Sequence, residues 1–123
     1  MSESKKIIIV EDDAILLKVL NVELLSNGFE TLSAVNGESG LDLIRKEKPD
    51  LVLLDLLMPK MNGFKVLEAL KNDEQLSKIP VVVLSNLSQK ADIEKAKDLG
   101  AIDFYEKATT DLSKLVEKIN KLC

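Results

Sequence analysis

The 123-residue sequence predicts a single α/β domain in which five parallel strands alternate with five helices, a doubly wound (βα)5 arrangement. Three observations carry this prediction. Short, continuous runs of Ile, Val and Leu recur along the chain, which is typical of strands buried on both faces of a parallel sheet. Longer stretches with apolar residues at helical spacing separate these runs. Gly or Pro lies near most of the junctions, where one element ends and the next begins.

The predicted strands differ in hydrophobicity. Residues 6–10, 51–54 and 81–84 form the strongly apolar runs, and residues 102–105 form a weaker one. Residues 30–35 are less hydrophobic, which suits a strand at the edge of the sheet.

Five helices are predicted from apolar residues that recur three or four positions apart. These residues are Leu16, Leu17, Leu20 and Leu24; Leu41 and Ile44; Val66, Leu67 and Leu70; Ile93, Ala96 and Leu99; and Leu112, Leu115, Val116 and Ile119. A short polar side chain before each helix can accept a hydrogen bond from its first free amide groups. On this basis we expect helix caps at Asp13, Asn36, Asn62, Ser88 and Thr110.

Composition excludes several kinds of function. Without histidine, the chain cannot carry a phosphohistidine or a Cys/His zinc site, and its one cysteine, Cys123, cannot form an internal disulfide. That cysteine usage fits a cytoplasmic protein. The net charge of −4, with charges of both signs interspersed, argues against direct nucleic-acid binding. No apolar run approaches the roughly 18 residues that span a membrane, and the N-terminus lacks the form of a signal peptide.

Polar side chains follow four of the predicted strands. In a doubly wound sheet, ligands bind beyond the carboxyl ends of the strands, so we expect these side chains to share one crevice. Each alone has an ordinary structural explanation, such as the helix cap expected of Asp13, but their coincidence favours a site. Asp55 also closes a strongly apolar run, a costly place for a charge without a purpose. The residues concerned are Glu11, Asp12, Asp55, Ser85 and Lys107.

These residue types suit phosphoryl chemistry. Carboxylates held close together repel one another, and a hard divalent cation such as Mg²⁺ relieves that conflict. An ionised aspartate can act as a nucleophile and carry a covalent phosphate without a general base. A lysine ammonium and a hydroxyl can then neutralise and bind the phosphoryl oxygens.

Four segments of the chain resemble the receiver domains of bacterial two-component systems, with order and spacing intact. The most specific segment runs from Pro49 through Asp55 to Met58-Pro59-Lys60-Met61-Asn62-Gly63. The others are Val-Glu-Asp-Asp at 10–13, Pro-Val-Val-Val-Leu-Ser at 80–85 and Gly-Ala-Ile-Asp-Phe-Tyr-Glu-Lys at 100–107. The resemblance covers essentially the whole chain. It implies one receiver domain, residues 1–123, with the flavodoxin-like receiver fold of single-domain regulators similar to those of chemotaxis.

The resemblance implies a role for each site residue. Asp55 is the expected phosphoacceptor. Asp12, Asp55 and the backbone carbonyl of Leu57 are expected to bind Mg²⁺ or Mn²⁺, and Glu11 to act through a metal-bound water. Ser85 is the expected switch hydroxyl, Lys107 the ion-pair partner of the phosphoryl group, and Phe104 the aromatic residue whose rotamer follows Ser85. Pro59 and Gly63 are expected to shape the loop after Asp55.

The same resemblance implies partners. We expect phosphorylation by a sensor histidine kinase or a histidine phosphotransfer protein, and recognition of a downstream protein by the fourth helix, fifth strand and fifth helix. The chain would catalyse only its own phosphorylation and dephosphorylation and would not otherwise be an enzyme. A stand-alone regulator, a phosphorelay shuttle and a piece of a larger protein all remain open.

The sequence departs from the family pattern in four places. Ala108 follows the lysine where proline is usual, and we expect a trans bond because a cis bond before alanine costs about 2.5–4 kcal/mol. Phe104 stands where tyrosine is frequent, and Tyr105 cannot replace it because neighbouring strand residues face opposite sides. Asn86 follows the switch serine where a small residue is common, and is expected to alter the phosphoryl lifetime. The fourth departure is a second apolar stripe on the first helix, expected to dock a partner and made of Ile15, Val19 and Val22.

Three other classes fit the sequence less well. An aspartate-nucleophile phosphohydrolase resembling the haloacid dehalogenase group would have Asp-x-Asp after the first strand and a cap insertion for its substrate. A nucleotide- or flavin-binding domain would have a glycine-rich loop after a strand, and none is present. A pseudo-receiver that only binds partners would not need the complete set of acidic, hydroxyl and lysine residues.

Overall fold

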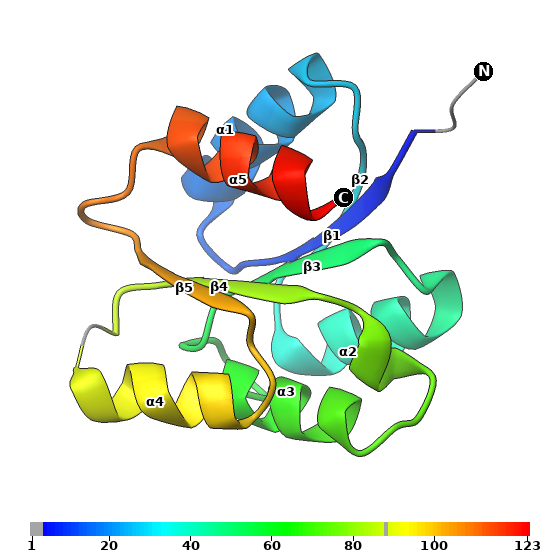
Figure 1. Ribbon diagram of the computed structural model, residues 1–123, viewed down its shortest axis with the longest axis vertical. Helices are drawn as coiled ribbons and strands as arrows, with labels where there is room; N and C mark the ends of the chain where they lie inside the picture. Colours follow the sequence, from blue (N-terminus) through cyan, green and yellow to red (C-terminus); the bar gives the residue numbers. More distant parts are fainter. Residues whose placement is uncertain (1–3, 88) are drawn as a thin grey trace.

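The computed structural model describes residues 4–87 and 89–123, and strands and helices alternate along this part of the chain (Figure 1). The strands are β1 (Lys6–Val10), β2 (Glu30–Ala34), β3 (Leu51–Leu54), β4 (Val81–Ser85) and β5 (Asp103–Glu106). The helices are α1 (Ala14–Ser26), α2 (Gly37–Glu47), α3 (Gly63–Lys71), α4 (Lys90–Asp98) and α5 (Leu112–Leu122), with a 3-10 turn η1 (Leu76–Lys78) before β4.

All strands pair in parallel, in the order β2-β1-β3-β4-β5. The predicted doubly wound fold is therefore confirmed, and the less hydrophobic β2 lies at an edge as expected. Three strands differ by one residue from their predicted bounds. β2 ends at Ala34, β4 continues to Ser85, and β5 is shifted to Asp103–Glu106 because Ser85 pairs with Glu106 in the register of these two strands.

The sheet separates two hydrophobic cores, because successive side chains of each strand point to opposite faces. Helices α1 and α5 cover one face, and α2, α3 and α4 cover the other (Figure 1). Ile7 and Ile9 face the first pair of helices, while Ile8 and Val10 face the second group. Phe104 packs on the core beneath α2, α3 and α4, whereas Tyr105 packs on the other core, so the two aromatics do face opposite sides.

Three of the five expected helix caps are confirmed. The side chains of Asp13, Asn36 and Asn62 accept hydrogen bonds from amides in the first turns of α1, α2 and α3. The prediction for Thr110 is wrong: its hydroxyl donates back to the Glu106 carbonyl at 2.5 Å, and Asp111 caps α5 instead. Ser88 lies outside the described residues.

Among the described residues, no helix is both long and apolar enough to cross a membrane.

The packing of α5 provides a test of the fold. Replacing the fully buried Ile119 with alanine should lower the free energy of unfolding by about 2–5 kcal/mol, since it removes apolar contacts and leaves a cavity. Replacing Leu25, which is 56% exposed on α1, with alanine should change the free energy of unfolding far less. Urea unfolding of both variants measures the difference, and equal losses would contradict this packing.

Candidate functional site

The carboxyl ends of β1 and β3 bring three carboxylates together. Glu11 and Asp55 directly follow these neighbouring strands, and their amides continue the backbone ladder by donating to Ala34 and Val10 carbonyls at 3.0 Å. Asp12 is the next residue after Glu11. One carboxylate oxygen from each of the three acids lies within 4.8 Å of the others. Glu11 and Asp55 are only 2% and 3% exposed, whereas Asp12 is open to solvent.

Lys107 is the counter-charge of the two buried acids. Its ammonium nitrogen lies 2.8 Å from Glu11 Oε1 and 3.1 Å from Asp55 Oδ2, and its side chain is 13% exposed. The Lys107 amide also donates to the Ser85 carbonyl at 2.9 Å, which ties the end of β5 to the end of β4. The predicted gathering of acidic and basic groups at this edge of the sheet is therefore present.

Burial governs the electrostatics of this cluster. It raises the pKa of Glu11 to about 7, with the nearby Asp55 acting in the same direction, while hydrogen bonds from Lys107 and the Asp13 amide oppose the rise. Burial alone would lower the pKa of Lys107, but its hydrogen bonds to Glu11 and Asp55 prevail and raise it. One ammonium thus serves two buried acids beside a third, which leaves the site short of positive charge.

The Glu11–Lys107 ion pair is a feature that the sequence analysis missed. It joins residues 96 positions apart, so no local pattern signals it. The strand order alone brings these two residues to the same edge of the sheet. Glu11 is fully engaged as a result: Oε1 contacts Lys107, and Oε2 accepts from Lys107 and from the Asp13 amide, both at 3.0 Å.

The expected switch residues occupy different surroundings. Ser85 is fully buried, and its hydroxyl oxygen accepts from the Leu87 amide at 3.3 Å. No hydrogen bond within residues 4–87 and 89–123 joins that hydroxyl to Asp55 or Lys107. Phe104 is half-buried in the core, and Asn86 is exposed. The switching and lifetime roles of these three residues stay predictions.

The loop after β3 reaches back to Asp55. The Leu57 amide donates to Asp55 Oδ1 at 3.3 Å, while the Leu57 side chain is 53% exposed. The Lys107–Ala108 bond is trans, as expected, because the described residues contain no cis peptide.

The second apolar stripe of α1 is exposed. Ile15, Val19 and Val22 are 79%, 40% and 59% exposed, on the helix that starts directly after Asp13. Their docking role stays a prediction.

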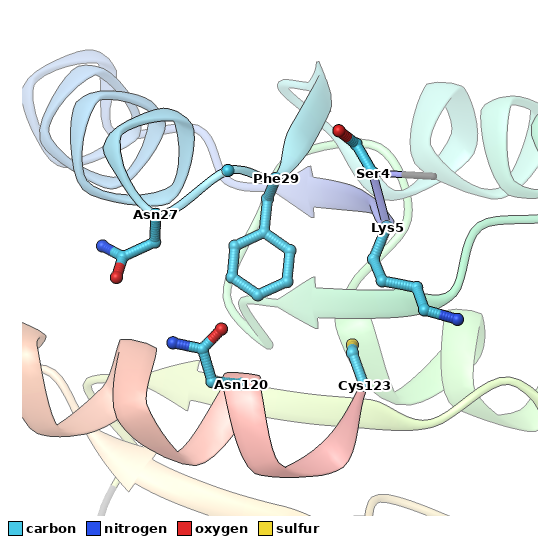
Figure 2. A pocket seen from close by; sticks show the side chains of 7 residues that line it. Ser4, Lys5, Asn27, Phe29, Asn120 and Cys123 are labelled. Atoms are coloured by element: carbon cyan, nitrogen blue, oxygen red, sulfur yellow. The ribbon is translucent and has the colours of Figure 1, made fainter. Parts of the chain in front are cut away.

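A separate pocket of about 250 Å³ lies away from the acidic cluster, next to the start of β1 and the ends of α1 and α5 (Figure 2). Burial raises the pKa of the Cys123 thiol in its wall, so this thiol stays protonated at neutral pH. The pocket is lined by Ser4, Lys5, Asn27, Gly28, Phe29, Asn120 and Cys123.

The shared ammonium makes a testable contribution to stability. Lys107→Met leaves two buried carboxylates without their counter-charge and should lower the free energy of unfolding by about 3–5 kcal/mol. Lys6→Met, which breaks the more exposed pair between Lys6 and Glu47, is the matched control and should lower the free energy of unfolding far less, because solvent screens that pair. Denaturant unfolding in EDTA compares the two variants. A Lys107 variant that is as stable as the Lys6 variant would contradict the role of Lys107 as the counter-charge of the two buried acids.

Comparison with known proteins gives a consistent result. The family described as the response regulator receiver domain matches residues 7–120. Protein PilH of Pseudomonas aeruginosa is 37% identical over 115 residues, covering 94% of this chain and 94% of PilH. The relative ycf27 of Porphyridium aerugineum is 34% identical over 105 residues, covering 85% of this chain, and the chain spans only 42% of the length of that relative.

A solved structure extends the likeness to three dimensions. The phosphorylated cyanobacterial phytochrome response regulator RcpA is 32% identical and superposes with a TM-score of 0.83, over 97% of this chain and 91% of that one. The acidic cluster at the strand ends, the strand order and these matches agree that the chain belongs to the response regulator receiver domain family.

Proposed function

We propose that residues 1–123 form one receiver domain that works as a phosphoacceptor switch, with Asp55 taking the phosphoryl group from a sensor histidine kinase or a histidine phosphotransfer protein. The observation that carries this proposal is the cluster of Glu11, Asp12 and Asp55 with Lys107 bridging the two buried acids. The chain would catalyse only its own phosphorylation and dephosphorylation, and its single cysteine is compatible with a reducing cytoplasm as the place of exchange.

The donor set fits a hard divalent cation. Mg²⁺ prefers one or two carboxylates together with waters and phosphate oxygens, and Mn²⁺ accepts similar ligands. Asp12 is open to solvent and Asp55 lies beside it, so these two are the proposed direct ligands, with the Leu57 carbonyl as the third. Both Glu11 oxygens are already engaged by Lys107 and the Asp13 amide, which supports an indirect role through a metal-bound water. When bound, the metal supplies the positive charge that the site lacks.

Asp55 is arranged to act as the nucleophile. One of its oxygens accepts from the Leu57 amide and the other from Lys107, so the carboxylate is held in one orientation. An ionised carboxylate oxygen forms the new bond to phosphorus, and the bond from phosphorus to the donor's imidazole nitrogen breaks. The electron pair stays on that nitrogen, and no proton has to be removed from Asp55. Lys107 is then placed to neutralise phosphoryl charge.

Readout would begin at Ser85. Its hydroxyl, now bonded to the Leu87 amide, would turn to the phosphoryl group, and the half-buried Phe104 on the neighbouring strand would follow. Asn86, exposed next to Ser85, would alter the phosphoryl lifetime. We assign recognition by a downstream protein to the surface formed by α4, β5 and α5.

Phosphorylation of Asp55 is tested by intact-mass measurement. With Mg²⁺ and a small phosphodonor such as acetyl phosphate, the wild type should gain one phosphoryl group. Asp55→Asn should gain none. Asp13→Asn is the matched control, because it removes a neighbouring carboxylate yet keeps a side chain that caps α1 well, and it should still be phosphorylated. A folded wild type that gains no phosphoryl group, or an Asp55→Asn variant that gains one, would refute the assignment.

We further propose that the exposed stripe of Ile15, Val19 and Val22 docks the phosphodonor protein. It lies on the helix that begins beside Asp12, so a protein seated on this stripe can reach the acidic cluster. An exposed apolar stripe of this kind is a common mark of an interaction surface.

Docking is tested by comparing two phosphodonors. Val19→Asp should slow transfer from a phosphorylated histidine phosphotransfer protein by about tenfold or more, since a charge replaces an apolar contact, and leave phosphorylation by acetyl phosphate unchanged. Ile102→Asp, at an exposed apolar residue just before β5, is the control and should transfer normally. Equal loss with both donors, or equal loss in both variants, would refute the docking surface.

A further inference from the structure

Two glycines make close contacts with the backbone of the loop that connects Asp55 to α3. The first, Gly63, starts α3, and its amide donates to the Leu56 carbonyl at 2.9 Å. A Cβ atom added to Gly63 would overlap the Asp55 carbonyl oxygen and lie 2.7 Å from Leu56 Cα. The start of α3 is therefore in direct backbone contact with Asp55, a proposed metal ligand, and with Leu56, which lies between Asp55 and Leu57.

The second glycine comes from a different part of the chain. Gly37 is the first residue of α2 and is buried against Met61, near the far end of the same loop. An added Cβ would overlap the Met61 carbonyl oxygen, and would lie 2.7 Å from the carbonyl carbon and 2.9 Å from the Met61 Cβ. Any side chain at position 37 must therefore move backbone, because a flexible side chain alone cannot make the room.

Neither α2 nor the loop that contains Met61 can move easily to make room for a side chain at position 37. The Asn36 side chain caps α2 through the Ser39 amide at 2.8 Å, and the buried Leu41 and Ile44 fix the helix in the core. The loop is a tight turn in which the Met61 amide donates to the Pro59 carbonyl at 2.9 Å. Lys60 in that turn has a φ of 67°, in the left-handed region. A displacement of Met61 would therefore pass along the turn toward Leu57.

We propose that Gly37 is a positioning residue for the metal site. Because Gly37 has no side chain, α2 can approach the Met61 backbone closely. The distance of this approach sets the position of the loop between Asp55 and α3, and hence the position of the Leu57 carbonyl. This inference rests on the proposed metal role of Leu57, and it assigns a function in metal binding to a residue on a helix that provides no ligand. A merely structural Gly37 would affect folding stability and leave the metal affinity of the folded protein unchanged.

The test compares Gly37→Ala with Gly28→Ala. Gly28 has a φ of 87°, so alanine there strains the backbone, but the added Cβ would meet nothing within 4 Å. Gly28 borders the pocket of Figure 2 and not the loop between Asp55 and α3. Mg²⁺ affinity is measured by calorimetry well below the melting temperature of each protein. We expect Gly37→Ala to bind Mg²⁺ about tenfold or more weakly, and Gly28→Ala to bind it as the wild type does. The Leu57 amide resonance should also shift in metal-free Gly37→Ala and stay in place in Gly28→Ala.

Each other outcome is decisive. Wild-type affinity in folded Gly37→Ala, or equal weakening in both variants, overturns the positioning role and leaves the proposed function standing. A wild type that binds no Mg²⁺ overturns the metal site of the proposed function and this inference together.

A milder pair of variants decides the matter if Gly37→Ala does not fold. Asn36→Ala removes the cap of α2, the helix whose first residue contacts Met61 in the loop between Asp55 and α3, whereas Asp111→Ala removes the cap of α5. Weaker Mg²⁺ binding by Asn36→Ala than by Asp111→Ala supports the positioning role, and equal binding overturns it.

Discussion

The interaction on which the site depends is the bond of one ammonium group to two buried carboxylates. Lys107 contacts Glu11 and Asp55, and without it the ends of β1 and β3 would bury two like charges side by side. The parallel order β2-β1-β3-β4-β5 makes this contact possible, because it directs all the strand ends to one edge. The hydrophobic strands and the charged edge are therefore linked. The buried strands place the two acids close together, and Lys107 offsets their mutual repulsion.

Most of the fold could be predicted from the sequence because its strands are buried on both faces. Runs such as Leu51–Leu54 have few alternative places in a small domain, and the weaker β2 could be assigned to an edge on hydrophobicity alone. The errors fall at boundaries, where local competition decides. Thr110 is a reasonable cap by residue type, but its hydroxyl donates to the Glu106 carbonyl instead. Asp111 caps α5 in its place.

The gathering of the acidic residues at one edge of the sheet was predictable, but the contacts of the candidate site were not. Strand ends place Glu11, Asp12 and Asp55 at one edge, which the alternation of elements already indicates. The pairing of Lys107 with Glu11 depends on side-chain geometry across the sheet, and the contact of Gly37 with Met61 depends on how closely a helix approaches a loop. A glycine that opens a helix is ordinary in sequence, and only its three-dimensional neighbour distinguishes this one.

The sharing of Lys107 suggests how a change at Asp55 can reach distant surfaces. A phosphoryl group carries up to about two negative charges and would compete with Glu11 for the only ammonium found in contact with these acids among the described residues. Lys107 is joined through its amide to the Ser85 carbonyl, so a shift of this side chain acts where β4 and β5 end. Phe104 lies on β5, three residues before Lys107, and packs on the core beneath α4. A local exchange of ion-pair partners at Lys107 is thus connected through Ser85 and Phe104 to β5 and α4, which belong to the surface proposed for downstream recognition.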